Sequence, residues 1–190
     1  MASPETALIK ERAELLTALR AKAVIYGKRT LASGSVSHYY IDGKQVSLDG
    51  RSAFLIGQLV LELIRPLKPT AFGGPTLGAD PITGAVIAEA ARQGFPLKGF
   101  IVRKDVKGHG TSKLIEGPAL GPGDRAVLVE DVITTGGSVK KAVDAVQAAG
   151  AKVIQIVALV DRQEGALEAL AMYNYTPLFS KSDLQIKSSF

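Results

Sequence analysis

Hydrophobic and polar residues alternate along the chain with two different periods, and these periods predict helices and strands. Near the N-terminus the apolar positions recur at helical spacing: Leu8, Ile9, Leu15, Leu16, Leu19 and Val24. This pattern predicts a helix over residues 5–25. A second helix is expected over residues 51–65, where Pro66 stops it. Between the two helices, residues 26–49 are rich in Gly, Ser and Tyr, and short alternating pieces such as VSHYYID favour strands or a hairpin.

From residue 66 onward, short apolar runs alternate with helical stretches. The runs cover 70–73, 97–103, 126–132 and 153–160, and the helical stretches cover 82–93, 137–149 and 165–172. Such alternation indicates βαβ units and an α/β domain with a central, mainly parallel sheet flanked by helices. We expect a single domain over residues 1–190, divided as follows: an N-terminal helix and hood, or flap, over 1–65, an α/β core over 66–175, and a C-terminal tail over 176–190.

Composition narrows the class of protein. The 190 residues are 46% hydrophobic and 22% charged, as in globular domains, and they include no cysteine, which excludes disulfides and cysteine-based sites. The N-terminus lacks a signal-peptide core, and no apolar stretch approaches the roughly 18 residues of a membrane span. We therefore expect a cytoplasmic protein without membrane contact. His38 and His109 are not spaced as a ligand pair, so we expect no metal site built by the protein.

The stretch VLVEDVITTGGSV at 127–139 contains the most informative chemistry. Glu130 and Asp131 stand at the end of an apolar run, where the ligand sites of parallel sheets lie. Buried carboxylates are costly without partners, so the pair should face a polar cleft. The segment Thr134-Thr135-Gly136-Gly137-Ser138 then leads into a helix, whose free N–H groups and dipole favour an anion. Phosphate at the loop and a sugar diol at the carboxylates suggest a ribose 5-phosphate.

A purely structural interpretation of this stretch is that Thr and Ser only cap the following helix. For an isolated TTGGS that interpretation would be favoured, but the preceding acidic pair reverses the preference. The segment is neither a Walker A loop, since no Lys follows the glycines, nor a G-x-G-x-x-G dinucleotide fingerprint.

The same stretch resembles the motif with which type I phosphoribosyltransferases bind 5-phosphoribosyl 1-diphosphate (PRPP). Other segments resemble the orotate-using branch of that family: LASGSVSHYYID (31–42), GGPTLGADPI (73–82), RKDVKGHG (103–110) and VDRQEG (160–165). The resemblance implies transfer of the phosphoribosyl group from PRPP to orotate, giving orotidine 5′-monophosphate and pyrophosphate in pyrimidine (UMP) biosynthesis. It implies that PRPP is bound by Glu130, Asp131, Val132, Ile133, Thr134, Thr135, Gly136, Gly137 and Ser138.

The basic segment RKDVKGHG predicts, from its residues alone, either a mobile loop or a solvated basic turn. The resemblance implies a catalytic role at the diphosphate for Arg103, Lys104, Lys107 and His109. It also implies that this loop crosses into the neighbouring site of a homodimer, and that Mg²⁺ arrives with PRPP.

The base would be held by residues of two other segments together with Thr134 of the PRPP-binding stretch. The resemblance implies that Arg162 binds orotate, with Thr134 and one or both of Tyr39 and Tyr40. The alternatives are an ion pair of Arg162 with Glu164 or Asp161, and an ordinary core-and-surface pair of tyrosines. The second loop, GGPTLGADPI, should lie against pyrophosphate and could contain a non-proline cis peptide.

The chain departs from the family at two places where some members carry lysine. Leu77 and Ala32 stand there, so the charge of the site should depend more on the loop at 103–110, and the identity of the base stays open. Two other functions are therefore kept: a phosphoribosyltransferase for another nucleobase, and a PRPP-sensing regulator that binds nucleic acid. The net charge of +5 permits the regulator, but no helix-turn-helix module precedes the core, so we expect no nucleic-acid partner.

Overall fold

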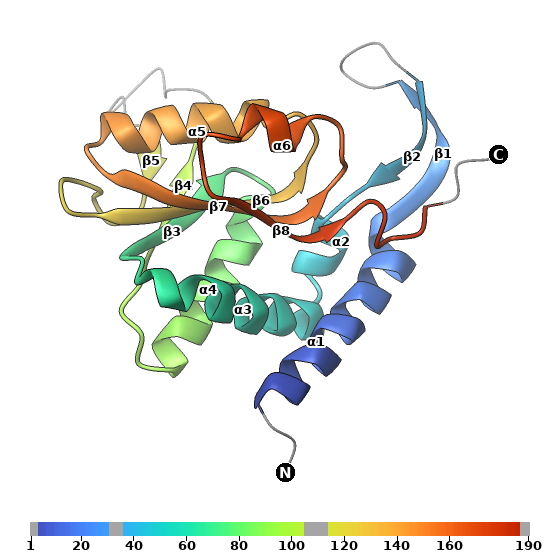
Figure 1. Ribbon diagram of the computed structural model, residues 1–190, viewed down its shortest axis with the longest axis horizontal. Coiled ribbons are helices and arrows are strands. Elements are labelled where there is room, and N and C mark those ends of the chain that lie inside the picture. Colours follow the sequence, from blue (N-terminus) through green and yellow to red (C-terminus); the bar gives the residue numbers. More distant parts are fainter. Residues whose placement is uncertain (1–3, 31–35, 105–113, 187–190) are drawn as a thin grey trace.

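Six strands form a central sheet in the computed structural model, which describes residues 4–30, 36–104 and 114–186 (Figure 1). Their order across the sheet is β5-β4-β3-β6-β7-β8, and only the β4–β5 pair is antiparallel. The strands are β3 (Ala71–Pro75), β4 (Lys98–Val102), β5 (Ile115–Glu116), β6 (Arg125–Ile133), β7 (Lys152–Asp161) and β8 (Tyr175–Ser180). The predicted α/β class with a mainly parallel sheet is confirmed.

Helices cover both faces of this sheet. Figure 1 shows α5 (Gly137–Ala148) and the short α6 (Ala166–Ala169) on one face, and α3 (Gly50–Ile64) and α4 (Ala79–Arg92) on the other. Along β6, Val127 and Val129 join the hydrophobic cluster under α3 and α4, while Leu128 joins the cluster under α5. This alternation follows from the two-residue period of a strand, and burial on both faces accounts for the continuous apolar run.

The N-terminal part has a helical base and a projecting two-stranded arm. It comprises α1 (Pro4–Ala18), the π-helical turn η1 (Leu19–Ala23), β1 (Val24–Thr30), β2 (Val36–Ile41) and α2 (Lys44–Ser47). The helix predicted over 5–25 therefore ends at Ala23, since Val24 begins β1, which pairs antiparallel with β2. Leu15 and Leu19 are buried in the main core, whereas Ile9, another of the apolar positions at helical spacing, is 66% exposed.

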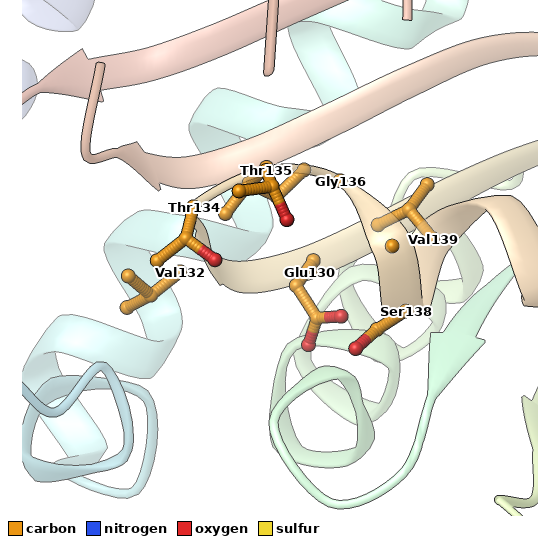
Figure 2. A pocket seen from close by; sticks show the side chains of 9 residues that line it. Glu130, Val132, Thr134, Thr135, Gly136, Ser138 and Val139 are labelled. Carbon is orange, nitrogen blue, oxygen red and sulfur yellow. The ribbon is translucent and has the colours of Figure 1, made fainter. Parts of the chain in front are cut away.

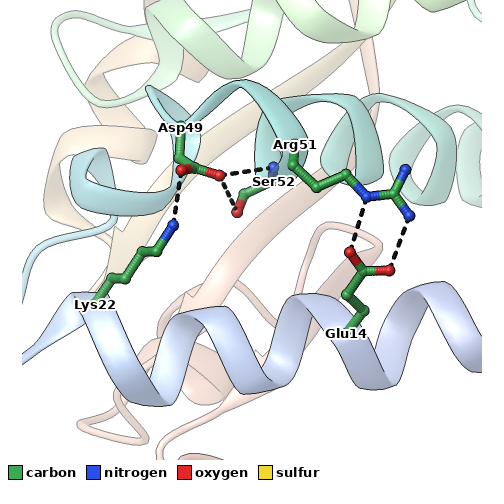
Figure 3. Close-up of polar contacts among 5 residues, drawn as sticks. All are labelled: Glu14, Lys22, Asp49, Arg51 and Ser52. Atoms are coloured by element: carbon green, nitrogen blue, oxygen red, sulfur yellow. Dashed lines mark hydrogen bonds and ion pairs between the residues drawn. The ribbon is translucent and has the colours of Figure 1, made fainter.

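Two ion pairs fasten this helical base to α3 (Figure 3). The Arg51 guanidinium donates to both carboxylate oxygens of Glu14, each at 2.8 Å. Asp49 caps α3 by accepting from the amide and the hydroxyl of Ser52, and it pairs with Lys22 at 2.7 Å. The base of the hood is thus packed on the core, and the β1–β2 arm extends past the carboxyl end of β8 (Figure 1).

Two segments near the C-terminus differ from the expectation. The helix predicted over 165–172 has only the four residues of α6, and Leu170 after it is buried against the loop at Gly136. The region taken as a tail after residue 175 contains β8, a strand of the main sheet whose Pro177 lies opposite Ala158. Proline is tolerated on such an edge strand, because one side of the strand makes no ladder hydrogen bonds.

The η2 turn (Arg65–Leu67) follows α3 at Pro66, where the sequence predicted the helix to stop. In the described ranges, no helix has the length and apolar character needed to cross a membrane.

Candidate active site

The acidic pair lies at the carboxyl end of the central strand β6. Asp131 is 8% exposed, and its carboxylate lies against the backbone of two loops: a Cβ added at Gly78 would be 2.2 Å from Asp131 Oδ1, and one at Gly43 would be 2.8 Å from its Cβ. The Val132 amide donates to Asp131 Oδ1 at 2.9 Å. Glycine is therefore required at both loop positions for this carboxylate to fit.

Burial perturbs both carboxyl groups. It raises the pKa of Glu130 to about 8, with a further contribution from the negative charge of Asp131. Burial also raises the pKa of Asp131, although the charge of Lys44 opposes this shift. Lys104, an exposed residue just after β4, opposes the shift at Glu130. Neighbouring carboxyl groups with raised pKa values are typical of functional sites, because a ligand or cation is needed to compensate them.

Lys44 is a site residue that the sequence analysis missed. Its ammonium lies 2.7 Å from Asp42 Oδ1 and 3.8 Å from Asp131 Oδ2. These two carboxylates raise the pKa of Lys44, so it stays charged. The signal in the sequence was present, since Gly43 and Lys44 follow VSHYYID directly, but their meeting with Asp131 depends on tertiary structure.

The loop after β6 forms a cavity of about 190 Å³. It is lined by Glu130, Val132, Ile133, Thr134, Thr135, Gly136, Gly137, Ser138 and Val139. Gly136 has φ +83°, which lets the chain turn from β6 directly into α5. Figure 2 shows the Glu130 carboxylate and the Ser138 hydroxyl pointing toward one another below the arch of the loop.

The polar groups of this cavity are available to a ligand. Within the described part of the chain, the hydroxyls of Thr134, Thr135 and Ser138 have no hydrogen-bond partner. The first N–H groups of α5 also point toward its N-terminus, where the helix dipole is positive. The structure therefore does not support the interpretation in which these residues only cap the helix. The arrangement suits a dianionic phosphate with a neighbouring hydroxylated sugar.

The second loop crosses from β3 to α4. It contains a non-proline cis peptide between Thr76 and Leu77, which confirms that sequence expectation. The Thr76 hydroxyl donates to Asp80 at 2.8 Å, and the Thr76 amide donates to the carbonyl of Val102. Leu77, at one of the positions where some family members carry lysine, is 64% exposed.

The basic segment is described only at its start. Arg103 follows β4, and its guanidinium lies 3.2 Å from Glu116 on β5. Lys107 and His109 lie outside the described residues, as does Ala32. Of the four residues expected at the diphosphate, the structure thus connects Lys104 electrostatically to Glu130 and gives Arg103 an ion pair at the sheet edge.

Arg162 directly follows β7, beside the start of the loop between β6 and α5. Its amide donates to the Ile133 carbonyl at 2.9 Å, and its guanidinium lies 5.2 Å from the centre of the Tyr39 ring. The side chain pairs with Glu164 at 2.8 Å, so the ion-pair alternative is present in the structure as well. Tyr39 is packed against the core, and Tyr40 lies close enough to Lys44 to interact with it electrostatically. Of the predicted base-binding residues, Arg162 and Tyr39 therefore lie together, beside the loop after β6 that begins next to Ile133.

The described residues contain no group of three or more His, Asp or Glu side chains that could hold a metal ion.

The chain is similar to known proteins over the segments that form most of this site. A family model described as "Phosphoribosyl transferase domain" matches residues 47–178. The chain is 46% identical over 159 residues to the orotate phosphoribosyltransferase of Streptomyces coelicolor, covering 84% of this chain and 87% of that protein. It is 46% identical over 176 residues to the one from Thermosynechococcus vestitus, covering 92% and 93%.

Solved structures give the same result. The orotate phosphoribosyltransferase of Mycobacterium tuberculosis H37Rv, crystallised in complex with PRPP, is 37% identical with a TM-score of 0.78, covering 93% of this chain and 99% of that one. An adenine phosphoribosyltransferase from Leishmania donovani, at 14% identity and a TM-score of 0.65, shares the fold alone.

Proposed function

The chain belongs to the phosphoribosyl transferase family, and we propose that it transfers the 5-phosphoribosyl group from PRPP to orotate. The products are orotidine 5′-monophosphate and pyrophosphate, in the biosynthesis of the pyrimidine nucleotide UMP. Two relatives named for this activity are 46% identical over most of both chains. The observation that carries the proposal is the acidic pair of β6, with Asp131 buried and Glu130 half-buried, beside the phosphate-sized cavity of its loop.

In this proposal Glu130 and Asp131 bind the ribose hydroxyls, and the segment Val132 to Ser138 binds the 5-phosphate. The support is their position at one strand end, with hydroxyls and helix N–H groups free to donate. Donors fixed in the fold before the substrate arrives need no reorganisation during the reaction, which lowers the barrier.

The basic residues of the segment 103–110 stabilise the charge of the leaving group. As the bond to pyrophosphate breaks, positive charge grows on the ribose and negative charge on the diphosphate. Arg103, Lys104, Lys107 and His109 stabilise that negative charge more in the transition state than in the ground state. Mg²⁺ enters as part of the PRPP substrate, and retains water ligands as Mg²⁺ usually does at phosphates. No covalent enzyme intermediate is required.

Arg162 orients the base, together with Thr134 and the tyrosines Tyr39 and Tyr40. A guanidinium offers a planar fork that matches a carboxylate or a pair of carbonyl oxygens. The buried position of Arg162, at 5% exposure, excludes competing water and strengthens this interaction. We further propose that the protein is a cytoplasmic homodimer in which the segment 103–110 reaches the neighbouring site.

The test is pyrophosphate release from PRPP and Mg²⁺ in the presence of orotate, uracil, cytosine, adenine, guanine and hypoxanthine, each supplied separately. Release with orotate alone is expected. Release with another base instead would transfer the proposal to that base, and no release with any base would favour a PRPP sensor over an enzyme.

A further inference from the structure

A second cation lies beside the base-binding residues, on a segment far from them in sequence. The Lys181 ammonium is 5.0 Å from the centre of the Tyr39 ring, and the Arg162 guanidinium is 5.2 Å from the same ring. Tyr39 comes from the β1–β2 arm, Arg162 from the end of β7 and Lys181 from the residue after β8. Three parts of the fold therefore converge on one aromatic ring.

The turn that carries Lys181, residues 181–185, is fixed against the residues on both sides of Arg162. The Lys181 amide donates to the Asp161 carbonyl at 2.7 Å. The Ser182 hydroxyl and amide both donate to Gln163 Oε1, at 2.6 and 3.1 Å. These bonds set the position of the Lys181 backbone relative to Arg162.

The far side of the same turn is held by the N-terminal base. The Arg20 guanidinium donates twice to the Asp183 carbonyl, at 3.0 and 2.7 Å, and Asp183 accepts from the amide and hydroxyl of Ser180. A turn anchored from both sides holds its lysine with little freedom at the backbone. A lysine that only faces solvent would not need hydrogen bonds on both sides of its turn.

The two cations have unused capacity for an anion. Arg162 is only 5% exposed, and its Nε has no hydrogen-bond partner. Its Nη2 forms the ion pair with Glu164. Within the described ranges, no carboxylate pairs with Lys181. The Tyr39 ring attracts both cations and offsets part of their mutual repulsion. An anion between them would remove that repulsion and satisfy the buried Nε.

We propose that Lys181 is a base-binding residue that, with Arg162, recognises the carboxylate of an anionic pyrimidine and selects it over a neutral one. This inference rests on the proposed function and adds the residue that sets its preference for an acidic acceptor. A desolvated carboxylate is poorly tolerated beside a single partly engaged guanidinium, and a second charge-assisted contact compensates it.

The experiment compares two nucleotides that differ only in the base carboxylate. Orotidine 5′-monophosphate and uridine 5′-monophosphate are titrated calorimetrically into the wild-type protein and into Lys181→Met. The variant should bind the first nucleotide roughly tenfold or more weakly, the loss expected for one charged contact, and the second nucleotide almost unchanged. Lys181→Arg should recover part of the lost affinity. Lys152→Met removes the same charge from the exposed opposite end of β7 and should change neither affinity.

The outcomes separate the two proposals. If the wild-type protein shows no preference for the carboxylated nucleotide, the proposed function and the inference are both overturned. If the wild type has the preference and Lys181→Met retains it in full, only the role of Lys181 is overturned. If Lys181→Met proves unstable, Lys181→Gln, which keeps a polar side chain, should show the same selective loss, and an unchanged ratio there would refute the role of Lys181.

Discussion

Asp131 occupies a space that is defined by backbone rather than by side chains. The loops at Gly43 and Gly78 close over its carboxylate so tightly that neither position has room for a methyl group. Lys44, which directly follows Gly43, compensates the negative charge of the Asp131 carboxylate. At the scale of single residues, the site therefore depends on two glycines and one lysine that lie far from the acidic pair in sequence.

Gly78→Ala should displace the Asp131 carboxylate, because the added Cβ would be 2.2 Å from its Oδ1. We expect the KM for PRPP to rise roughly tenfold or more, the loss of one charged hydrogen bond. Steady-state kinetics with PRPP as the varied substrate measures this. Gly84→Ala on α4 adds the same group where nothing lies within 4 Å, so it should leave KM unchanged and stabilise the helix slightly. Equal effects of both variants would contradict this account.

Lys44→Met should shift the acid limb of the pH profile of kcat/KM for PRPP to higher pH. The charge of Lys44 lowers the pKa of Asp131, against burial which raises it. Without that charge Asp131 becomes protonated at a higher pH. As the pH is lowered, kcat/KM for PRPP therefore begins to fall at a higher pH than in the wild type. The profile of Lys152→Met, at the other end of the sheet, should match that of the wild type. A Lys44→Met profile displaced toward acid would refute the pairing.

At the scale of elements, the turn from β6 into α5 depends on a left-handed residue. Gly136 has φ +83°, and its α-carbon faces Leu170 just after α6. Leu170, directly after α6, therefore supports the loop between β6 and α5 from outside. This contact also gives a reason for the burial of Leu170 at 0% exposure.

Gly136→Ala should destabilise the protein by about 1–2 kcal/mol, the cost of a left-handed non-glycine residue. The crowding at Leu170, where the new Cβ would be 3.2 Å from Cγ, adds to this cost. Urea unfolding measures the free energy. Gly137→Ala is the control for stability, since a Cβ there meets nothing within 4 Å and has ordinary helical geometry. A variant at 136 as stable as the control would show that the left-handed turn is not required.

The elements that the sequence predicted well have strong local signals. The apolar run of β6 and the 3.6-residue period of α5 are properties of neighbouring residues, and the acidic pair with its TTGGS loop stands within one short segment. β8 was missed because its apolar run is short and its pairing with β7 is a tertiary contact. Lys44 and Lys181 were missed for the same reason. Each becomes a candidate only when a distant segment is packed beside it.

At the scale of the whole molecule, the site should reduce stability. Glu130 has a pKa of about 8 in the folded protein against 4.5 for an ordinary glutamate. The folded state thus binds more protons than the unfolded state between these values, so the free energy of unfolding should fall as pH rises from about 4.5 to about 8. Above that range the penalty is complete and the slope from this group vanishes.

Glu130→Gln should remove this slope, because the amide does not ionise. The variant should be more stable than the wild type near pH 8, by an amount on the order of a few kcal/mol, while losing activity. Chemical unfolding at several pH values measures the difference. Glu168→Gln, at an exposed position on α6, should keep the wild-type slope. Parallel pH profiles for wild type and Glu130→Gln would contradict a raised pKa of Glu130.

The most direct test of the account is a calorimetric titration of the protein with PRPP in the presence of Mg²⁺. It isolates the claim that the carboxylates of β6 and the loop before α5 bind one phosphorylated ribose. We predict saturable binding at one site per chain, weakened roughly tenfold or more by Asp131→Asn and unaffected by Asp144→Asn on the exposed face of α5. Absence of binding by the wild-type protein, or equal affinity in Asp131→Asn, would contradict it.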